Sequence, residues 1–346
     1  MRLGRRGLLG LAAIGLSGVF AWRGWAWVET RPLRQAEAAY RRFDWGVAYA
    51  AAEAYRRTNP TSQAAALLAM RSLAQMGRCD AALRLSTQIA NPELDDLRLI
   101  ASCLIAQGTR GGSRPALKRA AELYRRIGLR DPTDSKALQS LVVLLIQLDE
   151  QAEAIETAKK LATNGSHARS AHAMLGAIYQ GQGNHALACE HLLQVLALDP
   201  QFNQGPESPE TLRRMLARSL LQLGRGAEAE PHLKRLLQTE SSPEVLWLLG
   251  HARQQQGDAE GAVAHWQDAI ERDADYLPAL KDLGELELAR HRPGAALKWL
   301  ECAARLAAKD ASVRYQLGLA SQQLGRTDEA ARRFQESQRL GTDPSN

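Results

Sequence analysis

Histidine and cysteine are the residues of this chain that could hold a metal ion or act as nucleophiles. The eight histidines and four cysteines are scattered, and their densest group is His185, Cys189 and His191. His185 and Cys189 lie four residues apart and so share one helix face, whereas His191 points elsewhere. No HExxH pair occurs in the sequence. We therefore expect exposed helix positions here and no metal site.

Motifs that carry enzymatic chemistry are missing from the sequence. It contains neither GxxxxGK[ST] nor GxGxxG, which cradle the phosphates of nucleotides, and no GxSxG that would present a serine nucleophile. Carboxylates such as Glu228, Glu230 and Glu260 fit solvated helix faces. We therefore expect a protein that is not an enzyme and that needs no cofactor.

The elements that would position any site follow a long repeat. Alanine returns at steps of 33 to 41 residues, most often 34, and a period of this length is typical of a helical solenoid. The recurring alanines are Ala48, Ala82, Ala120, Ala154, Ala188, Ala229, Ala262, Ala296 and Ala330.

A second column of small residues precedes these alanines by twelve positions. It consists of Gly176, Ala217, Gly250, Gly284 and Gly318. Four residues after the alanines come the bulky side chains Leu192, Leu233, Trp266, Leu300 and Phe334. Small residues let two helices approach closely where they cross, and the i, i+4 spacing indicates helix faces. Turn dipeptides such as Gly183-Asn184 lie between the columns, so each unit is predicted to be helix, tight turn, helix, and the chain all-α.

These features resemble the tetratricopeptide repeat family. The stretch Ala171–Pro200 matches its pattern at a leucine, a small residue, an aromatic residue, a glycine turn, an alanine and a closing Asp-Pro. The resemblance covers about residues 29–340 in roughly nine units, and it implies a right-handed superhelical solenoid after an N-terminal hydrophobic helix. Units from Ser135 onward fit well. The first three fit poorly, because Met70 stands where a small residue is expected and Gly108–Pro115 is predicted to be an inserted loop.

Four segments are predicted on this basis. Residues 1–28 form a signal anchor or signal peptide, and residues 29–134 form degenerate repeats. Residues 135–340 form well-fitting repeats, and residues 341–346 form a disordered tail.

The resemblance also implies a binding surface, because the first helix of each unit lines a concave groove in this family. The groove positions in this sequence hold Arg214, Arg218, Trp247, His251, Gln254, Lys281, Glu285 and Tyr315, together with Gln222, Gln255, Gln322 and Gln323. Aromatic and arginine side chains are frequent anchors at interfaces. Trp247 has two interpretations, contact with a partner or packing against the next unit. The positive charges of Arg214, Arg218 and Lys281 favour a peptide partner with some acidic character.

Charge and cysteine placement narrow the class of partner. The net charge of +6 falls to +2 without the four arginines that precede Glu29, and this balance argues against nucleic-acid binding. The cysteines, which are Cys79, Cys103, Cys189 and Cys302, fall in four different repeats without a CxxC pair. We expect them to pack as small apolar groups that lie too far apart for disulfides.

The amino terminus has the form of an export signal or a signal anchor. It opens MRLGRRGLLGLAAIGLSGVFAW, in which arginines precede an apolar run. Residues 8–28 together give the length that a membrane span needs. We expect a retained single-pass anchor in a bacterial inner membrane, with the repeats on the periplasmic side because arginines favour the cytoplasm. The alternative is cleavage after Ala21 to give a periplasmic protein.

The sequence thus predicts a scaffold or adaptor that binds partner polypeptides in a concave groove at the bacterial cell envelope. The alternative is a soluble periplasmic module, chaperone-like or substrate-presenting, after cleavage of the signal. Self-association is a further alternative, because the last helix, Thr327–Leu340, either caps the array or docks on a second protein or copy.

Overall fold

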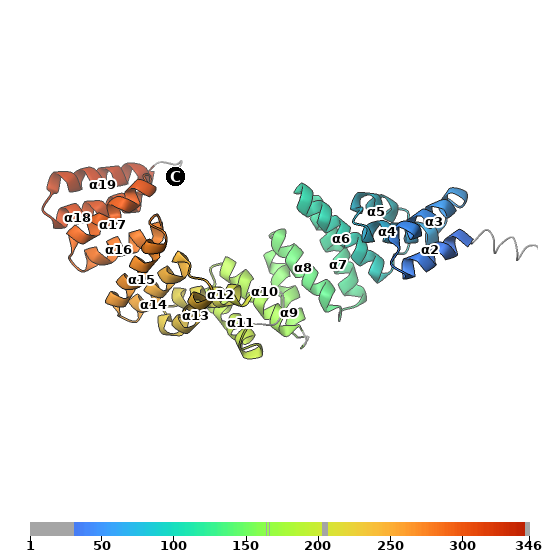
Figure 1. Ribbon diagram of the computed structural model, residues 1–346, viewed down its shortest axis with the longest axis horizontal. Coiled ribbons are helices and arrows are strands. Elements are labelled where there is room, and N and C mark those ends of the chain that lie inside the picture. The colour runs from blue at the N-terminus through green and yellow to red at the C-terminus, as the bar shows by residue number, and fades with distance from the viewer. Residues whose placement is uncertain (1–30, 164, 166, 203–206, 343–346) are drawn as a thin grey trace, which may run out of the picture. The chain divides into compact units, whose positions relative to one another are not determined.

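The computed structural model describes residues 31–163, 165, 167–202 and 207–342 (Figure 1). Within these ranges the chain forms eighteen helices and no strand, and the helices follow one another as nine antiparallel pairs. The first helices of the pairs are α2 (Arg31–Arg41), α4 (Gln63–Gln75), α6 (Leu94–Gly111), α8 (Ser135–Gln147), α10 (Ala168–Gly181), α12 (Pro209–Gln222), α14 (Pro243–Gln255), α16 (Leu277–Ala289) and α18 (Ala311–Gln323).

The second helices complete the pairs. They are α3 (Trp45–Thr58), α5 (Cys79–Ser86), α7 (Arg114–Arg130), α9 (Gln151–Ala162), α11 (His185–Leu198), α13 (Gly226–Thr239), α15 (Ala259–Arg272), α17 (Pro293–Leu306) and α19 (Thr327–Thr342). The predicted all-α array of nine helix-turn-helix repeats is confirmed for the described residues.

The pairs fall into two compact units. The first unit ends at His167 and contains α2 to α9, and the second begins at Ala168 and contains α10 to α19. The predicted division at residue 134, between degenerate and well-fitting repeats, concerns the match to a sequence pattern and stays a prediction.

The two columns of the repeat meet as the sequence predicts. A Cβ added to Gly176, Gly284 or Gly318 would lie 2.4 to 2.8 Å from the side chain found sixteen residues later, which is Leu192, Leu300 or Phe334. At Gly250 the same atom would lie 2.1 Å from Nε1 of Trp266. These glycines therefore let the first helix of each pair touch the large side chain of the second.

The turn inside each pair has one residue in the left-handed region. In six repeats this residue is a glycine, with φ between 61° and 80°. In three repeats it is another residue type, namely Phe43, Asp149 and His291, with φ between 55° and 62°. The tight turn predicted from Gly183-Asn184 is thus a property of the whole array, even where the sequence lacks the glycine.

The segment predicted to be an inserted loop is helical instead. Gly108 to Gly111 extend α6 to 18 residues, and only Gly112 and Ser113 separate it from α7. A Cβ on Gly108 would lie 2.4 Å from the side chain of Leu117, so this glycine permits close packing of α6 on α7. The insertion therefore lengthens a helix pair.

The prediction of a single-pass inner-membrane protein is contradicted. None of the helices in the described part of the chain is both long enough and apolar enough to cross a membrane. The N-terminal hydrophobic helix and the anchor over residues 8–28, on which that prediction rested, lie outside the described residues.

Ion pairs join consecutive repeats on the side of the first helices. Arg71 of α4 donates from Nε to the buried carboxylate of Asp96 in α6, at 2.5 Å. Arg214 of α12 contacts Glu240 and lies 3.7 Å from Glu244 of α14. We call these contacts, with the Lys281–Asp310 pair described below, the inter-repeat ion pairs.

The last helix presents a polar outer face. Arg332, Gln335 and Arg339 of α19 are exposed, whereas Ala330 is buried against α18. This pattern suits a terminal cap. The other alternative, docking of α19 on a second protein or copy, stays a prediction.

Candidate protein-binding groove

A groove of about 820 Å³ opens along the first helices of the second unit. It is lined by Ala177 and Gln180 of α10, Arg218, Leu221 and Gln222 of α12, Trp247, Leu248, His251 and Gln255 of α14, and Asp282 of α16, with Gly181 and His185 at one end. Four consecutive repeats therefore contribute to one surface, which we call the central groove.

Five of the predicted groove residues line the central groove, namely Arg218, Gln222, Trp247, His251 and Gln255. The other seven lie outside its lining, and they are Arg214, Gln254, Lys281, Glu285, Tyr315, Gln322 and Gln323. Asp282 and Gln180 line it although the sequence analysis did not single them out. The pattern of the family names positions on each helix, but it does not say which repeats come close enough to share a cavity.

Trp247 both lines the groove and packs against the next repeat. Its Nε1 donates to Oδ2 of Asp282 in α16, at 2.5 Å. Its ring makes edge contacts with His251, at 4.8 Å between centroids, and with Tyr276, at 6.4 Å. The interpretation that Trp247 packs against the next repeat is confirmed, whereas its contact with a partner stays a prediction.

Asp282 is the polar centre of this wall. Besides the indole of Trp247, it lies 3.0 Å from Nε2 of His251. The carboxylate thus satisfies two groove side chains at once, and it carries the negative charge of the groove lining. Both donors lie at Oδ2, so Oδ1 keeps its lone pairs for a partner.

The two arginines of α12 that the sequence predicted as groove residues have partners within the array. Arg218 contacts Glu244, and Arg214 contacts Glu240. The hydrogen bond from Arg214 to Glu240 raises the pKa of Arg214 above its usual value, against the effect of burial. Their charges are therefore balanced locally, although half of the Arg218 side chain stays exposed.

The remaining predicted residues make contacts farther along the array. Nζ of Lys281 donates to Oδ2 of Asp310 at 2.7 Å, and Glu285 accepts from Gln316 at 3.2 Å. Burial alone would raise the pKa of Asp310, but hydrogen bonds from Lys281 and Ser312 lower it to about 2.

Two predicted residues lie on the surface away from these ion pairs. Tyr315 is exposed beside Phe334, with the ring centroids 5.4 Å apart, and Gln254 is exposed on α14. Neither lines the central groove.

Glutamine amides fix the floor of the groove. Gln180 donates to the carbonyl of Met215 at 2.9 Å, and Gln255 donates to the carbonyl of Leu221 at 2.7 Å. Each bond joins one first helix to the next. Gln222 is exposed, and its amide has no partner among the described residues.

The described histidines and cysteines do not gather into a group that could bind a metal ion. Within the described ranges, no group of three histidine, cysteine or acidic side chains is placed to hold an ion. Cys189 is buried, His185 lines the groove, and His191 faces His172 with 3.0 Å between their Nδ1 atoms.

All four cysteines are free, although two of them lie in neighbouring repeats. Cys79 of α5 and Cys103 of α6 lie in neighbouring repeats, and their side chains interact. Cys103 is buried, as is Cys189, whereas Cys79 and Cys302 are partly exposed.

Comparison with known proteins gives one family match. The model of the tetratricopeptide repeat matches residues 167–239, which span α10 to α13. Among curated proteins, superkiller complex protein 3 of Homo sapiens is 30% identical over 176 residues, which make up 49% of this chain and 11% of that protein. The chain therefore spans about a ninth of the length of that relative.

Three solved structures illustrate the likeness of this chain to other helical-repeat proteins. YrrB, described as a tetratricopeptide-repeat protein with an unusual peptide-binding site, is 19% identical with a TM-score of 0.47, covering 59% of this chain and 99% of its own. PilW, described as a type IV pilus biogenesis factor, is 16% identical with a TM-score of 0.49, covering 61% and 95%. MamA of Desulfovibrio magneticus RS-1 is 18% identical with a TM-score of 0.43, covering 54% and 95%.

The matching family is typically a non-enzymatic interaction module, and no catalytic family is indicated. The family match supports tetratricopeptide repeats over residues 167–239, and the other described helix pairs have the same helix-turn-helix form. Proteins with this repeat generally act as scaffolds for protein interactions.

Proposed function

We propose that the chain is a protein-interaction scaffold whose central groove holds an extended segment of a partner protein. The observation that carries this proposal is the cavity of about 820 Å³ to which four consecutive repeats contribute. Its volume lies in the range of sites that enclose a ligand. A fixed tryptophan at its wall supplies the kind of side chain that anchors interfaces.

The side chains that remain available disfavour an acidic segment. Arg218 is balanced by Glu244, and Asp282 keeps Oδ1 open because Trp247 and His251 both lie at Oδ2. The free amide of Gln222 and the exposed N–H groups of Arg218 are suited to hydrogen bonds with main-chain groups of a partner. Ala177 and the Trp247 ring offer apolar contact. We therefore infer a largely apolar segment without acidic side chains, in place of the acidic peptide that the sequence favoured.

A pair of matched substitutions tests this proposal. Ala177 is exposed on α10 inside the groove, and Ala186 is exposed on α11 outside its lining. Ala177→Trp should fill the groove without touching the core, whereas Ala186→Trp adds the same side chain elsewhere. Peptides selected by phage display on the full chain should lose about tenfold or more in affinity for Ala177→Trp and keep their affinity for Ala186→Trp. Equal affinities for the two variants would rule out the central groove as the binding surface.

A further inference from the structure

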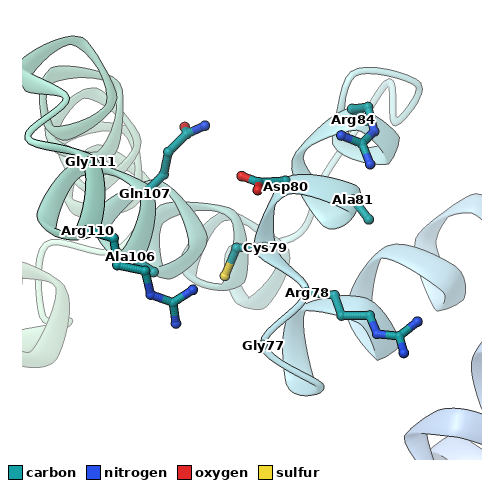
Figure 2. Close-up of a pocket in the computed structure, with 10 residues that line it drawn as sticks. All are labelled: Gly77, Arg78, Cys79, Asp80, Ala81, Arg84, Ala106, Gln107, Arg110 and Gly111. Atoms are coloured by element: carbon teal, nitrogen blue, oxygen red, sulfur yellow. The ribbon is translucent and has the colours of Figure 1, made fainter.

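A second cleft, of about 540 Å³, lies in the first unit between the start of α5 and the end of α6. Figure 2 shows its two sides, with Arg78 and Arg84 carried by the α5 side and Arg110 by the α6 side. Asp80 and Gln107 stand between them at the facing helix ends. We call this site the basic cleft.

The insertion in the third repeat builds one wall of the basic cleft. The other first helices contain 11 to 14 residues, whereas α6 contains 18. Arg110 and Gly111 lie in the added turn. The wall that carries Arg110 therefore has no equivalent in the other described repeats.

Arg78 lacks the partner that its equivalents have. An arginine follows the turn glycine in three repeats, as Arg78, Arg225 and Arg326. Arg225 pairs with Glu228 at 2.7 Å, and Arg326 pairs with Glu329 at 3.6 Å, in both cases three residues later. The residue three positions after Arg78 is Ala81. The local glutamate that neutralises this turn elsewhere is therefore replaced by alanine at the cleft.

The other two arginines of the cleft are also unpaired. In the part of the chain that the structure describes, the guanidinium groups of Arg84 and Arg110 have no hydrogen-bond or ion-pair partner, and Asp80 forms no ion pair with either or with Arg78. Three guanidinium groups and one carboxylate leave the lining with a net charge of +2. Asp80 weakens the positive field of the cleft without cancelling it.

The charge of the whole chain is concentrated in the same unit. Residues 31–167 hold 20 basic and 14 acidic side chains, a net charge of +6. Residues 168–346 hold 20 basic and 23 acidic side chains, a net charge of −3. The near balance of the whole repeat array therefore hides a basic first unit, and the basic cleft belongs to it.

We propose that the basic cleft binds an acidic peptide segment of a partner protein, at a site separate from the central groove. A guanidinium binds a carboxylate through two parallel N–H···O bonds, and arginine clusters are a common means of recognising acidic motifs. The arginines stand on both walls and do not converge on one point (Figure 2). Carboxylates spaced along a peptide can pair with arginines on both walls at once.

Binding of a fluorescein-labelled hexaglutamate peptide to the full chain, measured at low salt by fluorescence anisotropy, tests the proposal. Arg78→Ala and Arg110→Ala should each weaken binding by roughly fivefold, the upper range for an exposed ion pair. Ala81→Glu should weaken it to a similar extent, because it restores the local partner of Arg78 and keeps every arginine. A glutamate at this position in the first turn of α5 is also favourable for the helix, so the variant should fold.

A matched control uses an arginine in the same turn of another repeat. Arg326→Ala removes an arginine that already has a partner, Glu329, and should change hexaglutamate binding by less than about twofold. Trp247→Ala, at the central groove, should also leave it unchanged. An equal loss in Arg326→Ala, or no loss in Ala81→Glu, would overturn the proposal.

The cleft contains its own reporter of position. Cys79 lines the basic cleft and is partly exposed. Cys103 is buried, and burial together with the neighbouring Cys79 thiol raises the pKa of Cys103 to about 12. Bound hexaglutamate should slow alkylation of Cys79 by iodoacetamide and leave Cys302, in the second unit, unaffected. If tripolyphosphate slows the alkylation of Cys79 as much as hexaglutamate does, the cleft binds any anion of sufficient charge, and the acidic-peptide assignment is wrong.

Discussion

Gly250→Ala is the substitution that tests the packing of the array most directly. The added Cβ would lie 2.1 Å from Nε1 and 2.4 Å from Cδ1 of Trp266, a side chain with no exposed surface. Trp266 also donates from Nε1 to the carbonyl of Trp247 at 3.0 Å. The methyl group therefore must displace the indole and break this bond.

The expected cost follows from two terms. Overpacking a filled core costs about 1–3 kcal/mol, and a buried N–H left without an acceptor costs about 1–3 kcal/mol. Since both arise from one movement of Trp266, we expect a loss of about 3 kcal/mol in the free energy of unfolding. Urea unfolding followed by circular dichroism measures this loss, and tryptophan fluorescence reports the displacement of the ring.

Three variants calibrate the result. Gly176→Ala brings its Cβ to 2.8 Å from the flexible side chain of Leu192 and to 3.6 Å from the Ala188 carbonyl oxygen, and should cost about 1 kcal/mol. Gly294→Ala meets nothing within 4 Å in α17 and should stabilise slightly, by about 0.5 kcal/mol. Trp266→Leu in the Gly250→Ala background should recover part of the loss, because alanine already faces leucine in the repeat of Ala217 and Leu233. A Gly250→Ala protein as stable as the wild type would refute the packing argument.

The remaining predictions concern turns and ion pairs. His291→Gly should raise the unfolding free energy by about 1 kcal/mol by relieving a φ of 55°, and Gly257→Ala, at φ 80° in the equivalent turn, should lower it by a similar amount, both by urea unfolding. Asp310→Asn keeps the N-cap but removes a carboxylate whose pKa the fold lowers from 3.8 to about 2. It should therefore lower the free energy of unfolding by about 1–2 kcal/mol at neutral pH. That cost should disappear as the pH falls from 4 toward 2, where the carboxylate of the folded wild type is itself protonated, and a cost independent of pH would count against the assignment. Arg71→Ala leaves the buried Asp96 uncompensated and should cost about 3 kcal/mol, whereas Arg225→Ala removes an exposed pair and should cost less than about 1 kcal/mol.

The helix pairs and their core could be predicted because the repeat encodes contacts at a fixed separation. Gly250 and Trp266 stand sixteen residues apart in the sequence, as do Gly176 and Leu192, so one aligned column identifies the partner of the other. The central groove was predicted only in part. Trp247 could be identified from its place on the first helix, but Asp282 lies 35 residues away and has no distinctive neighbours in sequence.

The ion-pair partners of the groove arginines could not be predicted from the sequence. Arg214 and Arg218 read as free positive charges, because their partners Glu240 and Glu244 lie some 26 residues away in the next repeat. The glycine-rich insertion read as a loop, because glycine disfavours helices, yet the packing of Gly108 on Leu117 extends α6 through it. In both cases tertiary contacts outweighed the local preference.

Each of the inter-repeat ion pairs joins only two adjacent repeats. Losing Arg214 should therefore loosen the contact between α12 and α14, which the shared buried core still holds, and leave the contacts of the other repeats unchanged. Amide hydrogen exchange in Arg214→Ala should quicken around that contact alone. A local opening between two repeats therefore does not require the other repeats of the array to separate.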